Sequence, residues 1–85
     1  MTRSYKKFLK RLDSSGLRPE LEKRAKATRV SLQEIYEGPR TGPVIAARRA
    51  VYGWLRGTKS MGYREIARLF DRGSYSIWKL TREKA

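Results

Sequence analysis

The sequence contains no cysteine and no histidine among its 85 residues. Without cysteine the chain forms no disulfide and offers no thiolate to a metal, and without histidine it lacks the other common zinc ligand. Histidine is also the side chain that general acid–base catalysis uses most often. Ser4 and Lys7 have an S-x-x-K spacing, but the basic face of a helix explains that pair without a nucleophile. We therefore expect no metal, no other cofactor and no enzyme activity.

Long apolar runs are also missing. No stretch approaches the roughly 20 apolar residues that span a bilayer, and the N-terminus lacks the apolar stretch and small-residue cleavage site of a signal peptide. The sequence thus predicts a soluble, cytoplasmic protein that does not enter a membrane.

Acidic residues are few, because eight Asp and Glu stand against 21 Lys and Arg, which gives a formal net charge of +13. A surface of this charge attracts polyanions. Each Lys or Arg that neutralises a nucleic-acid phosphate releases a condensed counterion, so affinity for a duplex arises before any sequence is read. Acidic lipid would attract the same charge.

Helical periodicity runs through most of the chain, and 39% hydrophobic residues supply a core for one small domain. We expect an all-α fold, a small helical bundle with a C-terminal helix-turn-helix. Its first part, residues 1–16, is a basic amphipathic helix that Gly16 ends. An apolar stripe on this helix serves either for docking on the core or for binding a partner or a second copy of the chain. The stripe consists of Tyr5, Phe8, Leu9 and Leu12.

Turn and cap signals divide the middle of the chain. Pro19 suits the first turn of a second helix, and Ser31 with Glu34 forms a possible capping box for a short third helix. The loop 38–43 follows, and a longer helix then runs from Pro43 to about Arg56. Its predicted apolar side consists of Val44, Ala47, Val51, Trp54 and Leu55, with Arg48 and Arg49 turned away.

Residues 61–84 carry the helix-turn-helix pattern. Met61 and Ile66 occupy the positions of a hydrophobic staple, and small Ala67 permits close helix packing. The turn 71–73 joins two short helices, with Ser74 or Gly73 as the cap of the second. In that helix we expect Ile77, Leu80 and one side of Trp78 to face the core.

The opposite face of this last helix is predicted to enter the major groove of DNA, where the base edges distinguish all four pairs. Ser74, Tyr75 and Ser76 are the expected base-reading residues, with Lys79 and Arg82 beside them. The alternative is an ordinary helical hairpin, against which the staple, the small Ala67 and the polar helix start argue.

Residues 18–84 resemble the C-terminal duplex-binding domain of the bacterial replication initiator DnaA, a Trp-repressor-like helix-turn-helix. The stretch KATRVSLQEIY is similar to that family's helix end, β-branched link and short helix, and YREIARLF is similar to the start of its helix-turn-helix. Where the family carries Arg-Asp-His-Thr-Thr-Val this chain has RGSYSI at 72–77, so the resemblance implies duplex binding but not the family's usual origin sequence. The resemblance implies that residues 17–85 form the DNA-binding domain.

The resemblance also implies roles for basic residues upstream. Arg40 falls where the family places a loop arginine that enters the minor groove. Phosphate contacts are expected from Arg48, Arg49, Lys59, Arg64 and Arg72.

The family's nucleotide-hydrolysing domain is absent here, as is any G-x-x-x-x-G-K-[ST] loop. We therefore expect a stand-alone, sequence-specific double-stranded DNA-binding regulator of transcription or replication. The alternative is a small RNA-binding or ribosome-associated protein.

Overall fold

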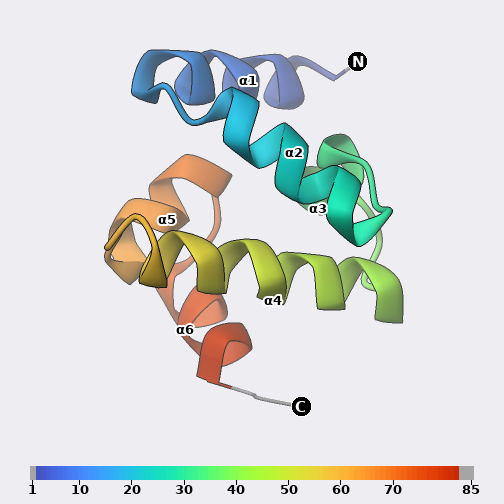
Figure 1. Cartoon of the computed structure of the whole chain (residues 1–85), viewed down its shortest axis with the longest axis vertical. Helices are drawn as coiled ribbons and strands as arrows, with labels where there is room; N and C mark the ends of the chain where they lie inside the picture. The colour runs from blue at the N-terminus through green and yellow to red at the C-terminus, as the bar shows by residue number, and fades with distance from the viewer. Residues whose placement is uncertain (1, 83–85) are drawn as a thin grey trace.

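The computed structural model describes residues 2–82, which form six α-helices and no strand (Figure 1). This confirms the prediction of a small all-α bundle. None of these helices has the length and apolar character that crossing a membrane requires. In chain order the helices are α1 (Arg3–Ser15), α2 (Arg18–Thr28), α3 (Leu32–Glu37), α4 (Gly42–Gly57), α5 (Tyr63–Phe70) and α6 (Ser74–Arg82).

Helix α4 is the centre of the bundle, because it packs against α2, α3, α5 and α6. Its predicted apolar residues Val44, Ala47, Val51, Trp54 and Leu55 are all buried. In Figure 1, α4 runs across the middle of the molecule, with α1 above it and α6 below. The N-terminal helix and α6 therefore lie on opposite sides of the bundle.

Helix α1 docks on the core through its apolar stripe. Phe8 stacks on Tyr36 with ring centroids 4.5 Å apart and meets Phe70 at 4.9 Å, and Phe70 in turn meets the edge of Tyr52 at 5.1 Å. All four stripe residues are buried by α1's neighbours α2, α3 and α5. The docking prediction is confirmed. The stripe is covered by the same chain, and a protein partner or a second copy bound through the N-terminal helix stays a prediction.

Local signals set most helix ends as expected. Gly16 closes α1 in the left-handed conformation, with φ of 72°, and Pro19 lies in the first turn of α2. The Ser31 hydroxyl accepts from the backbone N–H of Glu34 at 3.1 Å, so Ser31 caps α3. The carboxylate of Glu34 accepts from the Ser31 hydroxyl rather than from the Ser31 backbone, so the capping box is only half formed.

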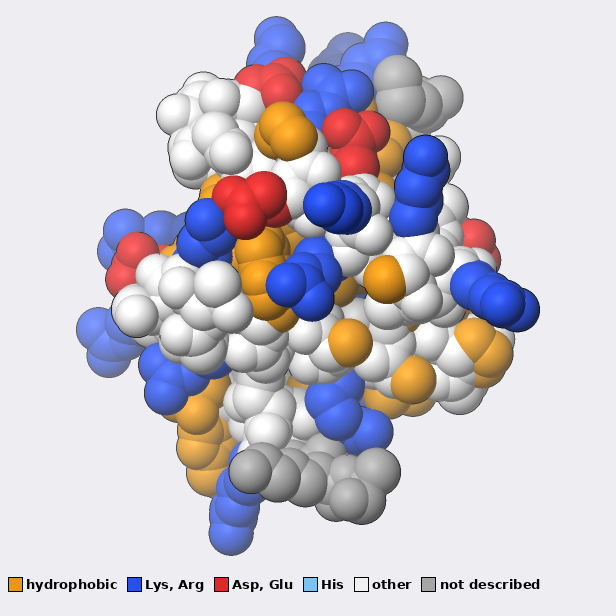
Figure 2. Space-filling model, in the orientation of Figure 1, with side chains coloured by type: hydrophobic (Ala, Val, Ile, Leu, Met, Phe, Trp, Pro, Cys, Tyr) orange, Lys and Arg blue, Asp and Glu red, His pale blue; other side chains and the backbone are white. Residues whose placement is uncertain are grey.

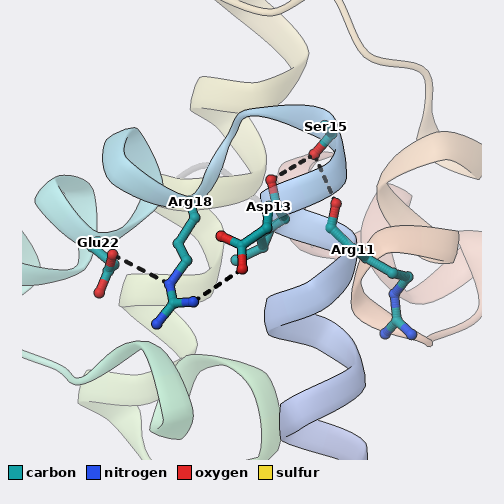
Figure 3. A network of polar contacts seen from close by, with 6 residues as sticks. Arg11, Asp13, Ser15, Arg18 and Glu22 are labelled. Carbon is teal, nitrogen blue, oxygen red and sulfur yellow. Dashed lines mark hydrogen bonds and ion pairs between the residues drawn. The ribbon is translucent and has the colours of Figure 1, made fainter.

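Polar contacts link α1 and α2 at their junction (Figure 3). The Arg18 guanidinium bridges Asp13 at 3.1 Å and Glu22 at 3.5 Å, and the Ser15 hydroxyl donates to the carbonyls of Arg11 and Leu12. Exposed ion pairs of this kind contribute at most about 1 kcal/mol each. The junction therefore depends mainly on Gly16 and on burial of the apolar residues around it.

Several arginines hold helices together instead of facing solvent. Nε of Arg11 donates to the carbonyl of Leu69 near the end of α5 at 3.1 Å, and Nε of Arg49 donates to the carbonyl of Leu80 in α6 at 3.2 Å. The last carbonyls of a helix lack partners within it and carry its partial negative charge, so a guanidinium satisfies and stabilises them. Part of the chain's positive charge is thus structural.

The connection between α5 and α6 is short. Asp71 ends α5 in the left-handed conformation, with φ of 55°, and the carbonyl of Gly73 accepts from Ser76 and Ile77 at the start of α6. Gly73 therefore occupies the cap position and Ser74 is the first helical residue, so the prediction of Ser74 as cap is wrong. Both helices pack against each other and α6 also packs on α4. Their assignment as a DNA-binding helix-turn-helix stays a prediction.

Candidate nucleic-acid interface

The outer face of α6 presents the polar residues predicted for it. Ile77 is fully buried and Leu80 packs partly against the core, which fixes the rotation of the helix. Tyr75 is 67% exposed and is the only large hydrophobic side chain so exposed among residues 2–82. The exposed set is the predicted one, namely Ser74, Tyr75, Ser76, Lys79 and Arg82.

Trp78 organises this face. Its ring lies 5.7 Å from the ring of Tyr75, and the guanidinium of Arg82 lies over it at 4.9 Å from the centroid. Trp78 is half-buried and does not belong to the hydrophobic core cluster, so the prediction that one side of it faces the core is wrong. Because Tyr75 and Arg82 rest on the indole, less side-chain freedom is lost when they bind a ligand.

A groove runs beside α6 and joins it to the loop before α4. We call it the basic groove. Four of its lining side chains are cations, Arg40, Arg48, Arg72 and Lys79, and no carboxylate lines it. Its volume is about 370 Å³. The whole lining consists of Arg40, Ile45, Arg48, Tyr52, Arg72, Tyr75, Ser76, Lys79 and Leu80. The structure thus brings together Arg40, Arg72 and three predicted residues of α6, although Arg40 is far from the others in the sequence.

The structure corrects the predicted position of Arg48. It was expected on the solvent side of its helix, yet only 4% of its surface is exposed. Its Nε donates to the carbonyl of Ile35 at 2.7 Å and its Nη2 donates to the carbonyl of Gly38 at 2.8 Å. These bonds tie α4 to the end of α3. Arg48 is thus a structural cation in the wall of the basic groove and not a surface side chain free to reach for phosphate.

Arg72 is both bonded within the fold and exposed to solvent. Its Nη2 donates to the carbonyl of Tyr36 at 2.6 Å, which anchors the turn between α5 and α6 on the end of α3. The residue as a whole is nevertheless exposed. Burial, reinforced by the nearby charges of Arg72 and Arg40, lowers the pKa of Arg48 below its ordinary value. The groove is therefore a place of concentrated positive potential.

Two other predicted phosphate contacts are engaged elsewhere. Arg49 is half-buried and donates to α6 through the bond to Leu80. Lys59 forms an ion pair with Glu20 at 2.7 Å and lies over the ring of Trp54. It follows the C-terminal end of α4, whose 16 residues span about 24 Å, whereas Arg40 precedes the N-terminal end. The structure does not bring Lys59 to the basic groove.

Arg64 is exposed on the other flank of α6. There a second hollow of about 510 Å³, which we call the aromatic groove, lies between the start of α5 and the start of α6. Its lining consists of Gly62, Tyr63, Arg64, Glu65, Ser74, Tyr75 and Trp78. Tyr75 borders both grooves, so it stands on the ridge between them. The N-terminal half of α6 is thereby flanked by a cation on each side, Arg64 and Arg40.

The distribution of charge favours this side of the molecule. In Figure 2, Lys and Arg side chains are scattered over the visible face, whereas the acidic side chains visible there lie in its upper and middle parts. Helix α6 contains no Asp or Glu between Ser74 and Arg82. Within residues 2–82, no three carboxylates gather closely enough to hold a metal ion. The visible lower part of the molecule thus carries positive charge without acidic side chains.

Sequence reasoning missed Tyr52, which forms part of the floor of the basic groove and is 1% exposed. Burial raises its pKa, while the charges of Arg72 and Arg48 act in the opposite direction. Its spacing of four residues from Arg48 places both side chains on one face of α4. This spacing was the available signal.

Comparison of the chain with models of known protein families, with curated proteins and with solved structures finds no match. The resemblance to the duplex-binding domain of DnaA therefore stays a prediction.

Proposed function

We propose that the chain binds double-stranded DNA in a sequence-specific manner through the outer face of α6 and the loop before α4. One observation carries this proposal: Arg40 of that loop and the exposed residues of α6 border the same groove. A helix fits the major groove, and an arginine beside it reaches the adjacent minor groove. The shared groove of the two elements supports this mode of contact.

Different side chains would contribute in different ways. Ser74, Tyr75, Ser76 and Lys79 stand on the face that would meet base edges. Arg64, Arg72 and Arg82 flank that face and would hold backbone phosphates. Arg49 and Lys59 leave this set, because their contacts within the fold occupy them or hold them away from α6, and Arg48 is buried and does not act as a surface contact.

The biological role would be control of transcription or replication by occupancy of specific sites. The sequence has no nucleotide-binding loop of the P-loop type, so the proposed effect comes from binding and not from nucleotide hydrolysis by this chain. Binding that excludes or recruits other proteins at a site is sufficient for such control.

The proposal is tested by equilibrium binding to duplex DNA and to a structured RNA of equal length at one salt concentration, followed by fluorescence anisotropy. A helix reads the wide major groove of DNA but not the deep, narrow one of RNA. We expect tighter binding to DNA, and a further gain on sites selected from random duplexes. Equal or tighter binding to the RNA would favour a small RNA-binding protein instead.

A further inference from the structure

The floor of the basic groove holds a buried polar atom without a partner. The hydroxyl of Tyr52 is almost completely buried and has no hydrogen-bond partner within residues 2–82, while Tyr52 still lines the groove. A buried hydroxyl that forms no hydrogen bond destabilises a fold, and such groups are rare in proteins. The position of this one, under a groove open to solvent, suggests that its partner is a ligand.

The surroundings of the hydroxyl define the charge of that ligand. Arg48 and Arg72 lie close enough for their charges to act on the Tyr52 hydroxyl, and both line the groove with Arg40 and Lys79. Bonds to the α3 carbonyls use two N–H groups of Arg48 and one of Arg72, so both guanidinium groups keep further donors. No carboxylate lines the groove, so its charged groups are all cations and its remaining polar side chains are hydroxyls that can donate. An oxyanion with several acceptor oxygens satisfies this arrangement.

The outer wall limits the source of the anion. Tyr75, Ser76 and Lys79 of α6 border the groove on the side where the proposed DNA contact lies. The volume of about 370 Å³ far exceeds one phosphate group, so a chain that continues along α6 fits better than an isolated ion.

We propose that the basic groove is a phosphate-binding site that takes one phosphodiester group of the DNA strand lying along α6, with the Tyr52 hydroxyl and the guanidinium groups of Arg48 and Arg72 as donors. This inference rests on the proposed function. It returns Arg48 to phosphate binding, but as a buried guanidinium in the wall of the groove and not as a surface side chain. It also gives the phosphate a fixed place, which sets the register of α6 on the duplex.

The test uses Tyr52→Phe, which removes only the hydroxyl, with Tyr5→Phe as the matched control. Tyr5 is also buried but belongs to α1, on the far side of the bundle. A hydrogen bond to a charged group corresponds to a loss of roughly tenfold or more in affinity when it is removed. We expect Tyr52→Phe to bind selected and random duplexes about tenfold more weakly, with an unchanged or raised melting temperature, and Tyr5→Phe to bind like the wild type.

A double-mutant cycle identifies the phosphate. Each backbone phosphate of the selected duplex is replaced in turn by a neutral methylphosphonate, and binding of wild type and Tyr52→Phe is compared. One position should weaken the wild type strongly and Tyr52→Phe much less. If Tyr52→Phe binds every duplex as tightly as the wild type, the phosphate site is refuted while the proposed DNA binding stands.

Inorganic phosphate separates the two proposals in the other direction. At matched ionic strength against chloride, phosphate should raise the melting temperature of the wild type more than that of Tyr52→Phe. If the wild type shows this effect but binds no duplex, the groove takes phosphate from another source and the proposed function fails. Ser76→Glu provides a second variant at an exposed position, and its carboxylate should remove the phosphate effect by occupying the groove.

Discussion

Replacing Arg48 tests whether its side chain holds the fold together or lies free on the surface. Replacing it by Met keeps most of the apolar volume of the side chain but removes the bonds to the carbonyls of Ile35 and Gly38 at 2.7 and 2.8 Å. Hydrogen bonds from a charged donor contribute about 1.5–3 kcal/mol each, or roughly 3–6 kcal/mol together. Removing a buried cation close to Arg72 returns part of this. We expect a net loss of about 2–4 kcal/mol.

The loss is measured by urea and thermal unfolding followed by circular dichroism. For a domain of this size, 2–4 kcal/mol corresponds to a fall in melting temperature of about 10–30 °C. Arg64→Met is the matched control, because Arg64 is exposed on α5 and should change the free energy of unfolding by about 0.5 kcal/mol or less. If Arg48→Met unfolds within 0.5 kcal/mol of the wild type, about the size of the control effect, the two bonds do not hold α4 to α3 as described.

Three further predictions concern the backbone, the charge and the pH dependence. Gly53 lies exposed inside α4 where an added Cβ meets nothing, so Gly53→Ala should raise the free energy of unfolding by about 0.5–1 kcal/mol. Gly16→Ala should lower it, because Gly16 ends α1 at φ of +72°. If both substitutions have the same effect in chemical denaturation, Gly16 does not act as the left-handed cap of α1. If Arg64, Arg72 and Arg82 each neutralise one phosphate, the slope of log K against log salt should be about −3, and a slope near zero would exclude the interface. Burial raises the pKa of Tyr52, so the folded protein keeps a proton that the unfolded chain loses above about pH 10. The free energy of unfolding should therefore decline as the pH rises above that value. Tyr52→Phe should show a smaller decline in alkaline unfolding, and an identical decline would show that Tyr52 does not titrate this way.

The sequence predicted the apolar faces well, because helical spacing and hydrophobic burial act together. The stripe of α1 and the residues of α4 chosen for the core are buried as expected. Gly16 and Ser31 also end or begin their helices as their chemistry predicts.

Arg48 could have been predicted from spacing but not from residue type. It lies four residues after Val44 and three and four before Val51 and Tyr52, so it belongs to the buried face of α4. The rule that charged side chains face solvent led to the wrong side. What overrides that rule is a tertiary feature, the carbonyls at the end of α3, which no local pattern reveals.

The candidate site also has one part that the sequence predicts and one part that it does not. The exposed residues of α6 follow from periodicity, since Ile77 fixes the buried side of the helix. The basic groove does not, because its lining comes from the loop before α4, from α4 itself, from the turn before α6 and from α6. Long-range packing places these parts side by side, so spacing alone puts Tyr52 on the face of Arg48 but does not show that it lines a groove.

Binding of selected and random duplexes by variants of α6 tests the central claim most directly. At one fixed salt concentration, Tyr75→Ala and Lys79→Ala should reduce the difference in binding free energy between the selected and the random duplex by about 1–3 kcal/mol. Both variants should bind the random duplex nearly as tightly as the wild type does. The control is Lys6→Ala, because Lys6 is exposed on α1 on the opposite side of the bundle. This variant should leave the difference in binding free energy unchanged. If the α6 variants discriminate as well as the wild type while Lys6→Ala does not, α6 is not the element that reads DNA.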